Sequence, residues 1–183
     1  MRTLADKTAQ TASADRAEVT TVLVVDDHQA VRLGIQMLLD DEPGIEVVAA
    51  TGSFGEGLAA ARRLAPDVVV VDYHLPGRDG LTLTHQLVTM ATPPRVLVFS
   101  AYADQRLELA ALLAGADGVL GKNSLGLELC QQIEALAWGR SLRPSISTRV
   151  LAAVSEEMEI EDRPILGMLA AGSRPTRSRG CWV

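Results

Sequence analysis

The chain has 183 residues, of which 48% are hydrophobic, enough for one well-formed core and an appended segment. Aromatic residues make up only 3%, so that core must consist mainly of aliphatic side chains. The net charge of -6 argues against a protein whose surface binds nucleic acid through general positive charge.

Residues 1–20 are rich in Thr, Ala, Asp and Ser and contain no apolar stretch of the kind found in secretory signals, so we expect a disordered segment there. The two cysteines, Cys130 and Cys181, match no metal-binding spacing and no disulfide framework. A reducing, cytoplasmic compartment is therefore the expectation. The apolar stretches are also too short to span a bilayer, so we expect no association with a membrane.

From Thr21 onward, short apolar runs alternate with stretches in which apolar residues recur at helical spacing. The predicted strands are Val22–Val25, Ile45–Ala50, Val68–Asp72, Val96–Phe99 and Asp117–Gly121. The predicted helices are Gln29–Leu39, Phe54–Leu64, Leu81–Met90, Ala103–Ala114 and a last one that Ser124 caps and that runs to about Trp138. Five such units predict an α/β fold, and strands that are apolar throughout indicate a doubly wound parallel sheet covered on both faces.

Four of the predicted strands are followed or ended by polar residues. These residues are the pair Asp26-Asp27, then Asp72, Ser100 and Lys122. Each alone is more typical of a helix cap, a turn or a solvated side chain. Parallel strands, however, place their carboxyl ends at one edge of the sheet, where such folds bind ligands. Three carboxylates, a hydroxyl and an ammonium at that edge favour phosphorylation of an aspartate with a bound divalent cation.

The same residues occur within longer motifs, which are Asp26-Asp27, Asp72 followed by Leu75–Gly80, Ser100-Ala101, and Ala114–Gly118 leading to Lys122. In this order and spacing they resemble the receiver domain of two-component response regulators, over about Thr21 to Gly139. The segments Glu42–Val48 and Gly115–Gly118 resemble the subgroup with LuxR-type (NarL/FixJ) output domains. The resemblance implies a flavodoxin-like receiver over residues 21–139 with strand order 2-1-3-4-5.

The resemblance also implies roles for these residues. Asp72 would accept a phosphoryl group from the phosphohistidine of a sensor histidine kinase. Mg²⁺ would be bound directly by Asp27 and Asp72, through water by Asp26, and by the backbone carbonyl of His74. Three carboxylates and one ammonium leave two negative charges, which one divalent cation offsets. We expect no metal role for the rings of His28 and His74, because the site is rich in oxygen ligands.

Lys122 and Ser100 would each contact a phosphoryl oxygen, and movement of the Ser100 hydroxyl would act as the switch. The family has an aromatic residue three positions before the lysine, whereas this chain has Val119. Valine cannot make the same rotamer change, so the resemblance implies weaker coupling or a different surface change. Tyr102, two residues after Ser100, is a candidate for the missing switch aromatic, although an ordinary loop aromatic is the simpler interpretation.

Residues 140–162 are expected to form a linker with a helix, and residues 163–183 resemble the first helix of a LuxR-type output domain followed by an irregular tail. The chain therefore looks like a regulator with a truncated or frameshifted output domain, and DNA binding is doubtful. The alternative is a DNA-binding transcriptional regulator that uses its tail or a partner's output domain. A phosphatase is disfavoured because His74, and not an Asp, stands two residues after Asp72. Surplus leucines in Ala103–Ala114 and Leu125–Trp138 favour a homodimer through helices 4 and 5, and the alternative is a monomer with scattered exposed leucines.

Overall fold

The computed structural model describes residues 19–124 and 126–140, so the segments predicted as a disordered lead-in, a linker and an output remnant lie almost entirely outside the described residues. The described chain forms one five-stranded parallel sheet in the order β2-β1-β3-β4-β5. Its strands are β1 (Thr20–Val25), β2 (Ile45–Thr51), β3 (Val68–Asp72), β4 (Arg95–Ser100) and β5 (Gly118–Gly121). The predicted fold class and strand order are confirmed.

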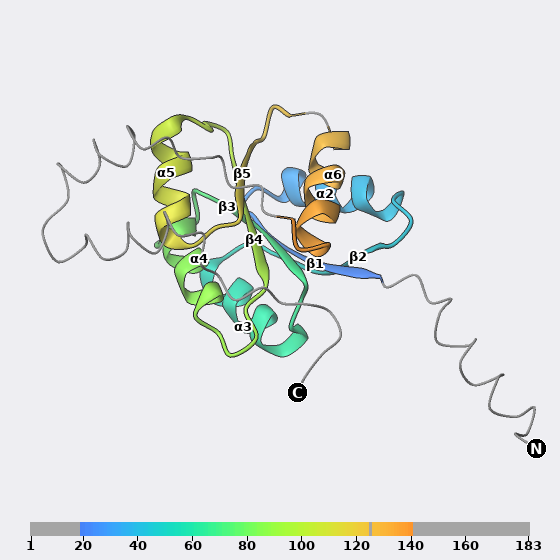
Figure 1. Ribbon diagram of the computed structural model, residues 1–183, viewed down its shortest axis with the longest axis horizontal. Coiled ribbons are helices and arrows are strands. Elements are labelled where there is room, and N and C mark those ends of the chain that lie inside the picture. The colour runs from blue at the N-terminus through green and yellow to red at the C-terminus, as the bar shows by residue number, and fades with distance from the viewer. Residues whose placement is uncertain (1–18, 125, 141–183) are drawn as a thin grey trace, which may run out of the picture.

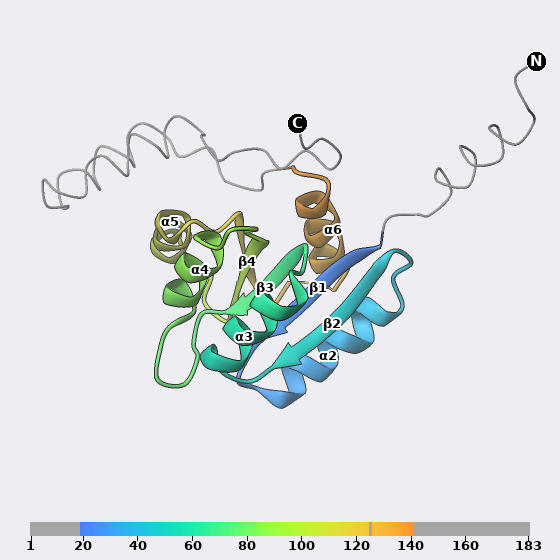
Figure 2. The same ribbon diagram turned by 90° about the horizontal axis from the view of Figure 1, so that it is seen from below.

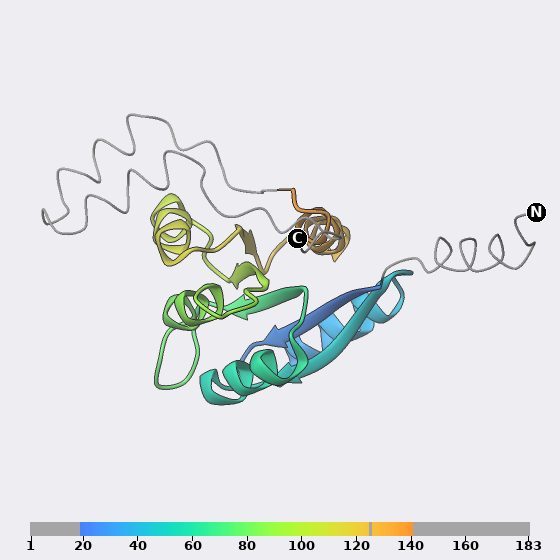
Figure 3. The same ribbon diagram turned by 60° about the horizontal axis from the view of Figure 1, so that its bottom comes forward.

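Helices cover both faces of the sheet (Figure 1). One face is covered by α2 (Gln29–Asp40) and α6 (Gly126–Ala137). The other is covered by α3 (Phe54–Leu64), α4 (Gly80–Val88) and α5 (Gln105–Ala114). Figure 3 shows α5 and α6 on opposite sides of β4 and β5.

Alternate residues of each strand pack into opposite layers. Val22 and Val24 belong to the cluster that faces α2 and α6, whereas Leu23 and Val25 belong to the cluster that faces α3 and α4. Strand β3 divides in the same way and is buried along its whole length. A strand covered on both faces has no solvent side, which is why these runs are apolar throughout instead of alternating.

Side-chain caps determine where several helices begin. The carboxylate of Asp79 accepts a hydrogen bond from the backbone N–H of Thr82 (2.6 Å), and that bond lowers the pKa of Asp79 below its ordinary value. Asp104 accepts in the same way from Leu107 (2.8 Å), so α5 begins at Gln105 and the predicted start at Ala103 is wrong by two residues. The predicted end of α4 at Met90 is late by two residues: the helix ends at Val88, and the hydroxyl of its C-cap residue, Thr89, donates to the carbonyls of His85 and Gln86.

The amino-terminal edge of the sheet contains one buried and one half-buried carboxylate, which hold strands together. Asp117 accepts a hydrogen bond from the backbone N–H of Val96 (2.9 Å) and forms an ion pair with Arg95 (3.2 Å). Asp67 accepts from both the backbone N–H and the hydroxyl of Thr21. These contacts join β5 to β4 and β3 to β1, so both acids have structural roles at the edge opposite the strand ends.

Replacement of Asp117 by Ala is expected to lower the free energy of unfolding by about 1–3 kcal/mol, because the buried N–H of Val96 loses its acceptor. Asp117→Asn should cost less, since a carbonyl oxygen remains. Glu46→Ala, an exposed position on β2, serves as a control and should stay within about 0.5 kcal/mol of the parent. Urea unfolding measures all three, and an Asp117→Ala variant as stable as the control would contradict the structural role.

Candidate functional site

The carboxyl ends of the strands bring the predicted site residues to one edge of the sheet. Figure 2 shows β1, β2 and β3 running in the same direction. Asp26 directly follows β1, Asp72 ends β3 and Ser100 ends β4. Lys122 directly follows β5, whose last residue, Gly121, is in register with Ser100. Residues separated by almost a hundred positions in sequence thus become neighbours, as the strand-end pattern predicted.

Lys122 joins the two buried carboxylates. Its Nζ atom lies 2.7 Å from Oδ2 of Asp26 and 2.8 Å from Oδ2 of Asp72. Asp26 is 1% exposed and Asp72 is 2% exposed, so neither acid has much access to water. One ammonium therefore serves two carboxylates, and the cluster is left with surplus negative charge.

Burial and the shared ammonium shift the pKa values of Asp72 and Lys122. Burial raises the pKa of Asp72 above its ordinary value, and the charge of Asp26 adds to the shift, although the hydrogen bond from Lys122 opposes it. For Lys122, burial acts to lower the pKa, but its contacts with the two acids outweigh that effect and raise it. The ammonium is consequently held in its charged form between the carboxylates.

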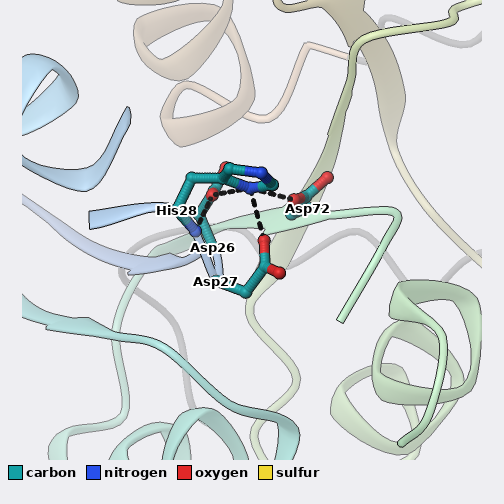
Figure 4. Close-up of side chains that lie close together, drawn as sticks. All are labelled: Asp26, Asp27, His28 and Asp72. Atoms are coloured by element: carbon teal, nitrogen blue, oxygen red, sulfur yellow. Dashed lines mark hydrogen bonds and ion pairs between the residues drawn. The ribbon is translucent and has the colours of Figure 1, made fainter. Parts of the chain in front are cut away.

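His28 takes a position that the sequence analysis did not predict. Figure 4 shows its imidazole among the side chains of Asp26, Asp27 and Asp72. Its Nδ1 atom lies 2.5 Å from Oδ1 of Asp27, 3.5 Å from Oδ1 of Asp26 and 4.0 Å from Oδ2 of Asp72. The backbone N–H of His28 donates to Oδ1 of Asp26 (2.8 Å), which closes a turn and folds the ring back over the acids. An aspartate two residues before a polar residue is the only sequence signal of this turn.

The other predicted residues are near the site in different ways. The backbone N–H of His74 donates to Oδ1 of Asp72 (3.3 Å). Ser100 is buried, but its Oγ atom lies within hydrogen-bonding distance of the backbone N (3.2 Å) and O (3.3 Å) of Tyr102. Val119 packs with the small cluster of Val98, Ala111 and Ala116, beside β4 and α5. Among the described contacts, the hydroxyl of Ser100 is thus directed at its own loop and not at Asp72.

Gly80, the first residue of α4, presses against the backbone of Asp72. A Cβ atom at this position would lie 2.0 Å from the carbonyl oxygen of Asp72. The Gly80 N–H donates to the carbonyl of Tyr73 (2.8 Å), and the preceding Asp79 caps the helix. The Asp79-Gly80 pair therefore holds the start of α4 against the end of β3, which explains why a glycine is needed here.

The model of the response regulator receiver domain family matches residues 22–136, which is most of the chain. The chain belongs to the two-component response regulators. As a receiver it is a signalling domain and not an enzyme in the ordinary sense.

Curated relatives include the DNA-binding transcriptional activator DevR/DosR of Mycobacterium tuberculosis, 33% identical over 82% of this chain and 74% of the relative. Another is the nitrate/nitrite response regulator protein NarL of Escherichia coli K12, 30% identical over 85% of this chain and 77% of the relative. The expected LuxR-type subgroup agrees with these relatives.

A solved structure of a LuxR-family two-component response regulator from Aurantimonas sp. SI85-9A1 is similar, with a TM-score of 0.65, 34% identity, and coverage of 77% of this chain and 99% of that one. Within residues 19–124 and 126–140 of this response regulator, no helix has the length and hydropathy required to cross a membrane.

Two glycines in helices are expected to respond oppositely to an added methyl group. Gly80→Ala should lower the free energy of unfolding by about 1–3 kcal/mol or more, because the Cβ atom overlaps the backbone of Asp72. Gly34→Ala, in α2, meets no atom within 4 Å and should raise it by about 0.5–1 kcal/mol through helix propensity. Thermal or urea unfolding compares the pair, and equal effects would show that the close approach at Asp72 is unimportant.

Proposed function

We propose that this response regulator accepts a phosphoryl group on Asp72 from the phosphohistidine of a sensor histidine kinase, in a pathway that controls transcription. The observation that carries the proposal is the position of Asp72 at the end of the central strand β3, paired with Lys122 at 2.8 Å and beside Asp26. The transcriptional output is supported by relatives such as DevR/DosR, which is described as a DNA-binding transcriptional activator.

The reaction is a transfer between two protein side chains. A carboxylate oxygen of Asp72 attacks the phosphorus, the phosphorus–nitrogen bond of the donor breaks, and the donor imidazole leaves with a proton from solvent. The product is an acyl phosphate. Lys122, already beside Asp72, contacts a phosphoryl oxygen. Water later attacks the phosphorus, the bond from phosphorus to the Asp72 oxygen breaks, and inorganic phosphate leaves while the carboxylate is restored. In this sense the site assists its own phosphorylation and dephosphorylation.

The donor set fits Mg²⁺. Ligand atoms of Asp26, Asp27, His28 and Asp72 all lie within 4.8 Å of one another, and the three acids supply the oxygen ligands that this cation prefers. We propose Asp27, Asp72 and the backbone carbonyl of His74 as direct ligands, with Asp26 acting through water. When bound, Mg²⁺ offsets the charge of the carboxylates and of the phosphoryl group. His28 contributes the one nitrogen, and its ring stands where the acids converge, so we propose that it swings out as the cation enters.

The switch follows from the contacts of Ser100. A hydrogen bond from Oγ to a phosphoryl oxygen on Asp72 requires the hydroxyl to leave the backbone of Tyr102. The loop after β4 then loses its tie to the strand end. Since Val119 is too small for an aromatic rotamer change, we propose that the activated surface is signalled by Tyr102, which is 78% exposed.

The homodimer through α5 and α6 remains a prediction. On α5, Leu107 and Leu112 are buried and Leu109 and Leu113 are half-buried, whereas Leu127 on α6 is 63% exposed. Light scattering with and without a phosphoryl mimic measures the molecular mass in solution and so distinguishes a monomer from a dimer. The residues expected to resemble an output domain lie outside the described range. A gel-shift assay with the full chain distinguishes a regulator that lacks a DNA-reading element from one that binds DNA.

Asp72 is expected to be the single residue phosphorylated by acetyl phosphate in the presence of Mg²⁺. Asp72→Asn should abolish the modification, because an amide is not a nucleophile of comparable strength. Asp79→Asn is the matched control: this residue is nearby, and asparagine still caps α4, so phosphorylation should be retained. Intact-protein mass spectrometry measures both, and full modification of the Asp72→Asn variant would place the acceptor elsewhere.

Neighbouring substitutions are expected to shift Mg²⁺ affinity in opposite directions. Asp27→Ala should weaken binding by about tenfold or more, because it removes a direct ligand. His28→Ala should tighten binding, because the ring that stands among the acids is removed. His74→Ala is the control, since its backbone carbonyl is kept. Titration followed by amide chemical shifts measures the affinities, and weaker binding in His28→Ala would make the ring a ligand and not an obstacle.

A further inference from the structure

Arg32 reaches back from α2 to the loop that holds the acidic pair. Its Nη1 atom donates to the backbone carbonyl of Asp26 (2.7 Å) and to that of Asp27 (3.1 Å). Its own backbone N–H donates to the carbonyl of His28 (3.1 Å) within the first turn of the helix. One side chain therefore connects two successive carbonyls that precede the helix.

These contacts do not serve as a helix cap. The groups left without partners at the start of a helix are N–H groups, and they need an acceptor. A cation near that end is also opposed by the helix dipole. The carbonyls of Asp26 and Asp27 belong to the loop before α2, so the guanidinium acts on the loop that carries the acids.

Asp27 depends on this contact more than Asp26 does. Asp26 is also held by its backbone hydrogen bond to Thr51 (3.1 Å) and by the ion pair with Lys122. For Asp27, the contacts found in the described chain are the one from its carboxylate to His28 and the one from its carbonyl to Arg32. Its side chain is otherwise directed only by the loop backbone.

The guanidinium lies against Gly52, in the loop between β2 and α3. A Cβ atom on residue 52 would lie 3.1 Å from Nη1, 3.5 Å from Cζ and 3.7 Å from Nη2 of Arg32. The N–H of Gly52 donates to Glu56 (3.3 Å), which holds this loop in place. Gly52 thus supplies a surface against which the flat guanidinium rests while it contacts the carbonyls.

We propose that Arg32 is a positioning residue of the phosphorylation site: it fixes the backbone that aims Asp27 toward Asp72. Gly52, which has no Cβ atom, leaves the space in which the guanidinium lies. The inference rests on the proposed cation site, which supplies the measurement. Charge alone predicts the opposite change in Mg²⁺ affinity, because a site that has lost a nearby positive charge attracts a divalent cation more strongly. The sign of the change in Mg²⁺ affinity therefore distinguishes positioning from electrostatics.

The test is Mg²⁺ titration of the full-length chain with Arg32→Met, Arg32→Lys and Arg63→Met. Arg32→Met should weaken binding by about tenfold, the magnitude typical of a lost contact that supports a metal ligand. Arg32→Lys should recover part of the affinity, since an ammonium also donates to carbonyls. Arg63→Met removes the same charge from an exposed position on α3 and should leave the affinity unchanged.

Gly52→Ala gives a second, independent arm. It should weaken binding in the parent, because the guanidinium must shift, but should have no further effect when combined with Arg32→Met. The single variant Gly52→Ala also covers the case in which Arg32→Met does not fold, because it displaces the guanidinium without removing it. Binding as tight as the parent in Arg32→Lys and Gly52→Ala, or tighter binding in Arg32→Met, overturns the positioning role. If Asp27→Ala itself leaves the affinity unchanged, the proposed cation site fails instead, and the two failures are separable.

Discussion

The interaction on which the site depends is the pairing of one ammonium with two buried carboxylates. Lys122 lies within 2.8 Å of both Asp26 and Asp72, which have almost no exposure to water. Burial of charge is costly unless the charge is paired, and here the pairing is incomplete. A fold selected only for stability has no use for such a cluster. Its presence is understandable if the missing positive charge is supplied by a cation and one of the carboxylates is used as a nucleophile.

Strand direction separates two kinds of acid that look alike in sequence. Asp67 and Asp117 lie at the amino-terminal edge, where backbone N–H groups, the Thr21 hydroxyl and Arg95 are hydrogen-bonded to them. Asp26 and Asp72 lie at the opposite edge, where their main partner is a single shared ammonium. The first kind joins neighbouring strands, and the second is left electrostatically incomplete. Parallel topology therefore places the carboxylates that join strands at one edge of the sheet and those with surplus negative charge at the other.

The strands and the convergence of their polar ends were predictable from sequence, because apolar runs and parallel topology depend on the order of residues alone. Helix starts were less predictable. The sequence pattern places Asp104 inside a helix, whereas its carboxylate accepts a hydrogen bond from the backbone N–H of Leu107 and caps the start of α5. Side-chain directions were not predictable. The ring of His28 reaches the acids through a local turn, and Arg32 reaches carbonyls five and six residues before it. Such contacts depend on loop geometry, for which residue spacing carries little information.

The same geometry limits how a signal can leave the site. Ser100 is tied to Tyr102 by two contacts with its backbone, both between neutral groups. A hydrogen bond to a phosphoryl oxygen is charge-assisted and roughly twice as strong, so under the proposed phosphorylation of Asp72 the exchange would be favourable. The N-cap of Asp104 keeps the start of α5 in place. The loop that the proposed switch would release therefore consists of three residues, 101–103. With Val119 packed beside α5 in place of an aromatic switch, the exposed ring of Tyr102 is the feature of this loop best suited to report the change.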